Sequence, residues 1–140
     1  MLVVIGIIIL IASLGAFIGF DTIGRSNVHS ERDLFVSLLT GARARALANV
    51  NQSTHGVHID PTNFVLFEDS TAPYTYTSGD PNNRVVARNA SVTKTGPGPD
   101  DILFLQLSGN VPVLNTGTVT LTGGAQSATI EINTAGRIDW

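Results

Sequence analysis

The sequence predicts an α+β fold, in which one long N-terminal helix packs on a small antiparallel β-sheet head. Residues 1–20 contain no charged side chain and a single polar one, Ser13. A helical pattern then continues into polar sequence, and no proline interrupts it before Pro61. Beyond Gln52 the chain changes to short alternating stretches separated by Gly, Pro, Asn and Asp, a pattern typical of strands and turns.

The first predicted element is the apolar half of the helix, residues 1–20. At about 1.5 Å per residue, these residues span about 30 Å, the thickness of the hydrocarbon core of a bilayer. We therefore expect a retained anchor that crosses the membrane once. The residues assigned to membrane and filament-core contacts are Met1, Leu2, Val3, Val4, Ile5, Gly6, Gly15, Gly19 and Phe20.

A cleaved secretory signal peptide is the alternative for this segment. It would need a basic region before a shorter apolar core and a cleavage site of small residues after it. No Lys or Arg precedes the run, and the small residues between Ala12 and Ala16 lie inside it, so an anchor is favoured. Arg25 and Arg32 follow the run, and the positive-inside rule alone favours a cytoplasmic head.

Residues 21–51 form the amphipathic half of the predicted helix. Apolar and small side chains recur there at three- and four-residue steps and share one face. We expect this face to pack on the head, and the arginines to stay in water. The face consists of Val28, Phe35, Leu38, Leu39, Ala42 and Ala46, with Glu31 in register and Leu34 and Leu47 widening it.

The predicted helix contains five glycines: Gly6, Gly15, Gly19, Gly24 and Gly41. Each costs about 1 kcal/mol relative to alanine in a helix interior. In membranes, small residues let helices approach closely. We interpret the glycines as contact points between neighbouring helices, and tolerated flexibility is the alternative.

Residues 52–140 are predicted to form the β-rich head. Asp60-Pro61-Thr62-Asn63 indicates a hairpin turn, and Gly123-Gly124-Ala125-Gln126 indicates another. The prolines and glycines of residues 95–101 predict a loop. The predicted strands are 55–59, 64–68, 84–88, 102–107, 118–122, 128–133 and 137–140.

Composition and motifs argue against an enzyme. The chain has no cysteine, hence no thiolate nucleophile or thiolate metal site. We find neither a Gly-x-Ser-x-Gly elbow nor a glycine-rich phosphate loop, and we predict no cofactor. His55 and His58 are three residues apart, so on a strand they face opposite ways. Asp100 and Asp101 are candidates for a calcium site, with a solvated acidic loop as the alternative.

Charge is unevenly distributed along the chain. Residues 21–51 carry four arginines against three acids, whereas residues 52–140 carry four cations against eight anions. An acidic head is not expected to attract nucleic acid. The only candidate cations for such a contact are Arg84, Arg88 and Lys94.

Several segments resemble a known family. Residues 1–8, Met-Leu-Val-Val-Ile-Gly-Ile-Ile, resemble the stretch that follows the glutamate of the type IV prepilin motif Gly, Phe-Thr-Leu-x-Glu. Residues 32–35 and 42–46 resemble the helix of H-type (FimT-like) minor pseudopilins of type II secretion. Residues 55–60 and 130–138, the latter ending in Gly136-Arg137-Ile138, match the same pattern. The resemblance covers both ends and hardly touches residues 70–115.

The resemblance implies a structural subunit of a filament or pseudopilus. It places the protein in the bacterial inner membrane with its head on the outer side. Its partners would be other pilin or pseudopilin subunits, the inner-membrane assembly machinery and the lipid bilayer. Type II secretion and a type IV pilus both remain open. The alternatives are a DNA-uptake minor pilin and a solitary membrane-anchored binding domain.

The leader, the cleavage glycine and Phe-Thr-Leu-x-Glu of the family motif are missing from the sequence. Leader cleavage and N-methylation depend on that motif. We expect the coding sequence to start upstream of Met1, with a glutamate directly before it; the alternative is a chain without a normal processing site.

Overall fold

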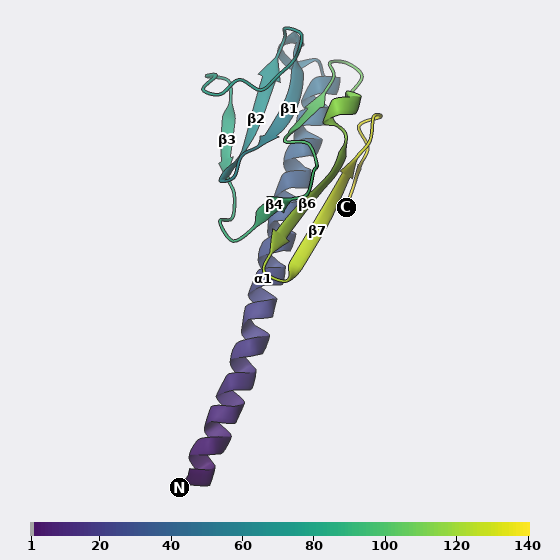
Figure 1. The fold of residues 1–140 in the computed structure, drawn as a ribbon. Coiled ribbons are helices and arrows are strands. Elements are labelled where there is room, and N and C mark those ends of the chain that lie inside the picture. The colour runs from purple at the N-terminus through teal and green to yellow at the C-terminus, as the bar shows by residue number, and fades with distance from the viewer. Residues whose placement is uncertain (1) are drawn as a thin grey trace.

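The computed structural model describes the backbone of residues 2–140 and the side chains of residues 3–7 and 24–140. Its first element, α1 (Leu2–Leu47), is a helix of 46 residues, which is about 70 Å long at 1.5 Å per residue. Figure 1 shows that the head packs beside the C-terminal part of α1, while the N-terminal part extends well beyond it. The expected α+β architecture, with an N-terminal helix packed on antiparallel sheet, is confirmed.

The helix ends slightly earlier than its predicted limit near residue 50. Asn49 adopts the left-handed conformation with φ 55°, which asparagine tolerates better than most residues and which commonly ends a helix. A single 3-10 turn, η1 (Val50–Gln52), follows. It leads directly into the first strand of the head.

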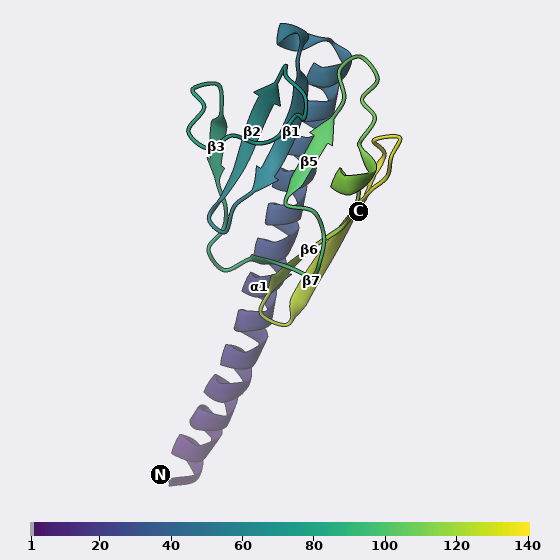
Figure 2. The same cartoon turned by 45° about the horizontal axis from the view of Figure 1, so that its top comes forward.

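The head contains two four-stranded antiparallel sheets, rather than the single small sheet that the sequence predicts. Sheet A has the order β3-β2-β1-β5, and sheet B has the order β4-β6-β7-β8. In Figures 1 and 2, sheet A lies toward the C-terminal end of α1 and the β6–β7 hairpin of sheet B lies nearer its N-terminal end.

The strands agree with the predicted ones with two exceptions. β4 was not indicated by the sequence, and the strand predicted over 102–107 ends at Phe104, because the chain turns there and Leu107 adopts φ 62°. Sheet A consists of β1 (Thr54–Ile59), β2 (Asn63–Asp69), β3 (Arg84–Ala87) and β5 (Asp101–Phe104). Sheet B consists of β4 (Thr93–Thr95), β6 (Gly117–Gly123), β7 (Gln126–Ile132) and β8 (Ile138–Asp139). A second 3-10 turn, η2 (Val113–Asn115), precedes β6.

Both predicted hairpins are present. The turn between β1 and β2 is closed by a hydrogen bond that Asp60 N donates to Asn63 O at 2.9 Å. In the β6–β7 hairpin, Gly123 pairs with Gln126, which leaves a two-residue loop in which Gly124 has φ 61°. Glycine suits this position because left-handed backbone costs it no steric penalty.

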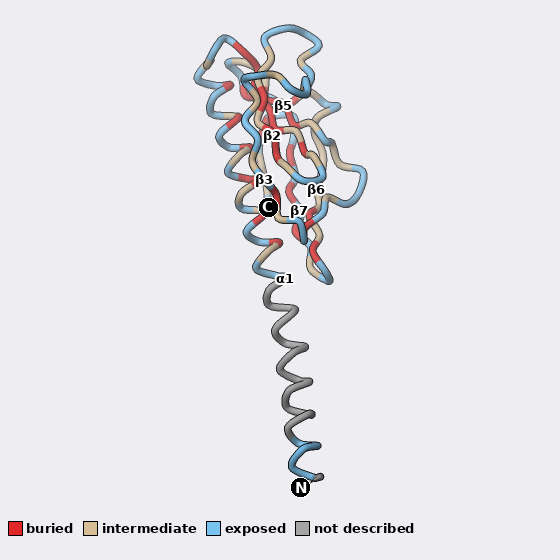
Figure 3. Tube along the Cα trace, turned by 90° about the vertical axis from the view of Figure 1, so that its left-hand side faces the viewer, coloured by how far each residue is buried: buried red, intermediate tan, exposed pale blue. Residues whose placement is uncertain are grey.

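One hydrophobic core joins α1 to both sheets. Figure 3 shows the buried positions of α1 on the side that faces the strands, with exposed positions on the opposite side. Along β6 and β7 every second residue is buried, so the other face of this hairpin is open to solvent. From the strands, the core includes Val57, Phe64, Ile102, Phe104, Val119, Leu121, Ile130 and Ile132.

Candidate functional site

The N-terminal part of α1 presents apolar side chains that the head does not cover. Val3 is 75% exposed, and Val4, Ile5 and Ile7 are each more than half exposed. Among the described residues, a methyl group added at Gly6 would meet no atom within 4 Å outside the backbone of its own helix. These side chains are therefore free to contact another apolar surface.

The other residues assigned to this half are Met1, Leu2, Gly15, Gly19 and Phe20, and their predicted contacts lie outside the described residues. Among the residues that are described, no helix combines the length and the apolar character needed to cross a bilayer.

The part of α1 that meets the head begins near Val28. Phe35 and Leu39 have no exposed surface, and Val28, Ala42 and Ala46 are equally enclosed. Leu38 is only partly buried and lies at the margin of the core. The Phe35 ring stacks on that of Phe64 from β2, with the ring centroids 4.9 Å apart. Val36 is also buried, although the helical period did not assign it to this face.

A buried ion pair fastens α1 to the head. Arg88 donates a hydrogen bond from Nε to Glu31 Oε1 at 3.0 Å, and the side chains are only 1% and 3% exposed. Asn89 N donates to the second carboxylate oxygen of Glu31 at 3.1 Å. The guanidinium group of Arg88 also lies over the Phe64 ring, 4.8 Å from its centroid.

The other two nitrogens of the Arg88 guanidinium each donate to a backbone carbonyl. Nη1 donates to Asp60 O at 2.7 Å, and Nη2 donates to Val92 O at 3.4 Å. Arg88 thus ties the helix to the β1–β2 turn and to the segment before β4. A buried charge pair is tolerated only when such additional hydrogen bonds satisfy it.

A second set of contacts connects α1 to the loops before β6 and β8. Arg43 donates from Nη2 to Ala135 O at 3.2 Å, and its buried Nε has no hydrogen-bond partner among the described residues. Gly136, with φ 71°, approaches so closely that an added Cβ would lie 2.0 Å from Gly109 O. Arg43 and Gly136, two residues of the segments that resemble pseudopilins, therefore meet in space.

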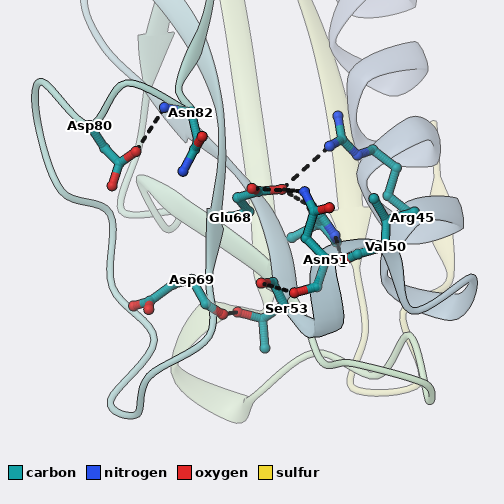
Figure 4. Close-up of polar contacts among 10 residues, drawn as sticks. Arg45, Val50, Asn51, Ser53, Glu68, Asp69, Asp80 and Asn82 are labelled. Carbon is teal, nitrogen blue, oxygen red and sulfur yellow. Dashed lines mark hydrogen bonds and ion pairs between the residues drawn. The ribbon is translucent and has the colours of Figure 1, made fainter.

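Near the C-terminal end of α1, polar groups from α1, η1 and β1 surround the Glu68 carboxylate (Figure 4). Asn51 Nδ2 donates to both of its oxygens, at 3.0 and 2.9 Å, and Arg45 approaches to 3.4 Å. Buried His55 donates to Val50 O at 3.0 Å and lies 3.7 Å from Glu68. The adjoining cavity measures about 20 Å³, which is room for about one water molecule.

The two strand histidines have different surroundings, as expected from their spacing. His58 lies between Asp101, 2.5 Å from Nδ1, and Asp60, 3.1 Å from Nε2. Its ring stacks on Tyr76 with centroids 3.9 Å apart. His55 belongs to the Glu68 network instead. Within the part of the chain that the structure describes, no three His, Cys, Asp or Glu side chains form a metal-binding group.

The two candidate calcium ligands, Asp100 and Asp101, contact different side chains. Asp100 Oδ1 accepts a hydrogen bond from Lys94 at 2.5 Å, while Asp101 contacts His58. Lys94 therefore already neutralises Asp100, and the His58 ring already occupies Asp101. Arg137 directly precedes β8. Its hydrogen bond to Asp139, and then the charge of Asp139, raise the pKa of Arg137 above its usual value.

The three candidate nucleic-acid contacts do not form one basic patch. Arg88 is buried against Glu31, and Lys94 is bound to Asp100 and to the Gly98 carbonyl. Arg84 is exposed at the start of β3. Only one of the three cations is therefore presented freely to solvent.

Two larger clefts lie on either side of the loop that joins β4 to β5. The larger measures about 800 Å³ and is polar, with His58, Asp60, Lys94 and Asp100 on its walls. The smaller measures about 420 Å³ and lies between Pro97, Pro99, Leu114 and the threonines of β6. Most charged groups of the larger cleft are already paired with one another.

Comparisons with known proteins add no assignment. No family model, no curated protein and no solved structure matches this chain.

Proposed function

We propose that this protein is a structural subunit of a type IV pilin-like filament, held in the bacterial inner membrane before assembly. The single observation that carries the proposal is the division of α1. From Val28 onward one face of its C-terminal part packs on the head, whereas its N-terminal part extends well beyond the head (Figure 1). The side chains of Val3, Val4, Ile5 and Ile7 in that N-terminal part are exposed. A helix of this kind requires an apolar environment for its free half.

The uncharged run of residues 1–20 supports a lipid environment for that half, and neighbouring helices of the same kind supply one in a filament. The helix has no charged residue that would need a partner there until Asp21. Within the family that the sequence resembles, an H-type minor pseudopilin of type II secretion is the preferred assignment. A minor pilin of a type IV pilus is the second.

Two alternatives make different demands. A DNA-uptake pilin needs clustered exposed cations, and only Arg84 among the three candidates is freely exposed. A solitary anchored binding domain needs an open site, and the large polar cleft has most of its charges paired internally. A filament subunit needs neither feature.

Cell fractionation tests the proposal. In cells that carry the assembly machinery, the full chain should be found in the membrane fraction and in the sheared filament fraction. A variant without residues 1–20 should be absent from both. Equal recovery of the two proteins in either fraction would contradict the proposal.

A further inference from the structure

We propose that residues 70–83, which connect β2 to β3, form a pH-sensitive strap that protonated His58 holds on the outer face of sheet A through Tyr76. Below, these residues are called the strap. The outer face is the face of sheet A that points away from the core shared with α1. This inference goes beyond the proposed filament function and does not depend on it.

The outer face of sheet A carries apolar side chains that do not belong to the main core. Phe64 of β2 lies in that core, so Val65 and Phe67 point to the opposite face, because side chains alternate along a strand. Both are nevertheless buried, with 2% and 4% of their surface exposed. The Phe67 ring lies across Gly56 of β1, since an added Cβ there would be 2.6 Å from it. A covered apolar surface therefore lies outside the core.

Tyr76 attaches the middle of the strap to this face. Its ring lies flat on the ring of His58, with centroids 3.9 Å apart and an interplanar angle of 9°. It also meets the Phe67 ring edge-on, with centroids 5.7 Å apart. Tyr76 thus joins the strap to one titratable and one apolar residue of the sheet.

The rest of the strap is tied mainly to its own ends. Its residues, all of which the structure describes, form neither helix nor strand, and loops of this length in compact domains are often functional. The Asp69 carboxylate accepts hydrogen bonds from the backbone amides of Thr71 and Thr75, at 2.8 and 3.1 Å (Figure 4). Tyr74 adopts φ 55°, which strains a bulky residue. The attachment at Tyr76 therefore decides whether the middle of the strap stays on the sheet.

His58 has a carboxylate at each ring nitrogen. The register of β1 and β5 places Asp101 opposite His58, with Nδ1 2.5 Å from Asp101 Oδ1, and Nε2 lies 3.1 Å from Asp60 Oδ1. A neutral imidazole carries one N–H and can donate to only one of them, whereas an imidazolium donates to both. The arrangement therefore suits a protonated His58, which also binds the Tyr76 ring as a cation.

The direction of the pH response follows from this geometry. The titratable and charged side chains around His58 are Asp60, Asp101 and Tyr76, and along the same cleft Lys94, Asp100 and Arg88. Among these residue types, histidine is the one whose charge ordinarily changes between about pH 5 and pH 8. As the pH rises through this range, one carboxylate loses its donor and Tyr76 loses the cation beside its ring. The strap is therefore held most firmly at low pH, and its release at higher pH uncovers Phe67.

Spin labelling of the full chain in detergent micelles tests the strap. The chain has no cysteine, so Ser78→Cys can carry a single nitroxide at an exposed position of the strap. Losing a hydrogen bond to a charged group shifts an equilibrium about tenfold or more. Between about pH 5.5 and pH 8, the ratio of mobile to immobile label should rise by about this factor. The matched control, Ser127→Cys at an exposed position of β7, should show no change.

Three substitutions in the Ser78→Cys chain identify the parts of the strap. His58→Gln should remove the pH dependence, because the new side chain does not titrate. Tyr76→Ala should leave the label mobile at both pH values. Asp101→Asn should move the midpoint of the response to lower pH, because a nearby negative charge favours the imidazolium. A purely structural role of Asp101 would leave that midpoint where it is.

Two results would overturn the strap. One is a label at Ser78 that does not respond to pH in the otherwise unchanged chain, or that still responds after His58→Gln, since the proton would then belong to His29 or His55. The other is a Tyr76→Ala chain whose label is as immobile as before. If His58→Gln does not fold, the midpoint of Asp101→Asn decides, and an unchanged midpoint contradicts the proposal. The filament function is tested separately, by cross-links between helices.

Discussion

Glu31 on α1 and Arg88 after β3 form a buried ion pair with a 3.0 Å hydrogen bond between them. The two residues are 57 positions apart, and each also binds backbone groups of the head. A shift of the head along or around α1 would break this pair and leave charges buried. Its geometry therefore fixes the position of the head on the helix.

Removing one partner of this pair should destabilise the fold strongly. Glu31→Ala or Arg88→Ala should lower the free energy of unfolding by about 3–5 kcal/mol, because the remaining charge stays buried without its partner. The control is Arg32→Ala, which breaks an ion pair with the largely exposed Asp33 and should cost at most about 1 kcal/mol. Chemical denaturation measures both, and equal losses would contradict the role of the buried pair.

The apolar face of α1 should show graded sensitivity to truncation. Leu39 is fully buried whereas Leu38 is partly exposed, so Leu39→Ala should cost about 2–5 kcal/mol and Leu38→Ala clearly less. Ser37→Ala, at the exposed position directly before Leu38, should change stability by no more than about 0.5 kcal/mol. Thermal unfolding ranks the three variants by their loss of stability. A larger loss for Leu38→Ala than for Leu39→Ala would mean that the helix is rotated relative to the head.

Alanine substitution at two glycines, Gly56 and Gly41, should change the stability of the fold in opposite directions. At Gly56 an added Cβ would lie 2.6 Å from the Phe67 ring and 2.7 Å from Ile102 O, so Gly56→Ala should destabilise sheet A by about 1–3 kcal/mol. An added Cβ at Gly41 would meet no described atom within 4 Å outside the backbone of its own helix, so Gly41→Ala should stabilise α1 by about 1 kcal/mol. Unfolding curves of the two variants should shift to opposite sides of the wild type. Shifts in the same direction would contradict the conclusion that a methyl group clashes at Gly56 and fits at Gly41.

The head should fold without the apolar half of the helix. Every described residue of the core lies at Val28 or beyond, so deletion of residues 1–20 removes none of these contacts. We expect a soluble monomer with a cooperative unfolding transition, measured by size-exclusion chromatography and circular dichroism. Aggregated or unfolded protein would contradict the division into helix and head.

Local patterns were sufficient to predict most of the fold. The three- and four-residue spacing placed Phe35, Leu39 and Ala42 on the buried face, and the Asp60–Asn63 turn fixed the first hairpin. β4 was missed because Thr93-Lys94-Thr95 shows no alternation of apolar residues. Its pairing with β6 is a tertiary contact that no local window contains.

The polar contacts were harder to predict than the elements. Helical spacing placed Glu31 on the buried face, but nothing local identifies a partner 57 residues away. Arg88 was accordingly a candidate for nucleic-acid contact, and the structure shows it buried. The same holds for Arg43, whose approach to Gly136 depends on two loops that are distant in sequence.

Cysteine cross-linking at Gly15 and Gly19 tests the central proposal most directly, because it measures whether the apolar halves of neighbouring helices touch. In cells with the assembly machinery, Gly15→Cys and Gly19→Cys chains should form cross-linked dimers, and a chain carrying both should form a ladder of larger species. Ser37→Cys, an exposed position on the helix beside the head, is the matched control and should form less. The same low yield at all three positions, in protein recovered from the membrane fraction, would contradict the proposed filament subunit and favour a solitary anchored domain.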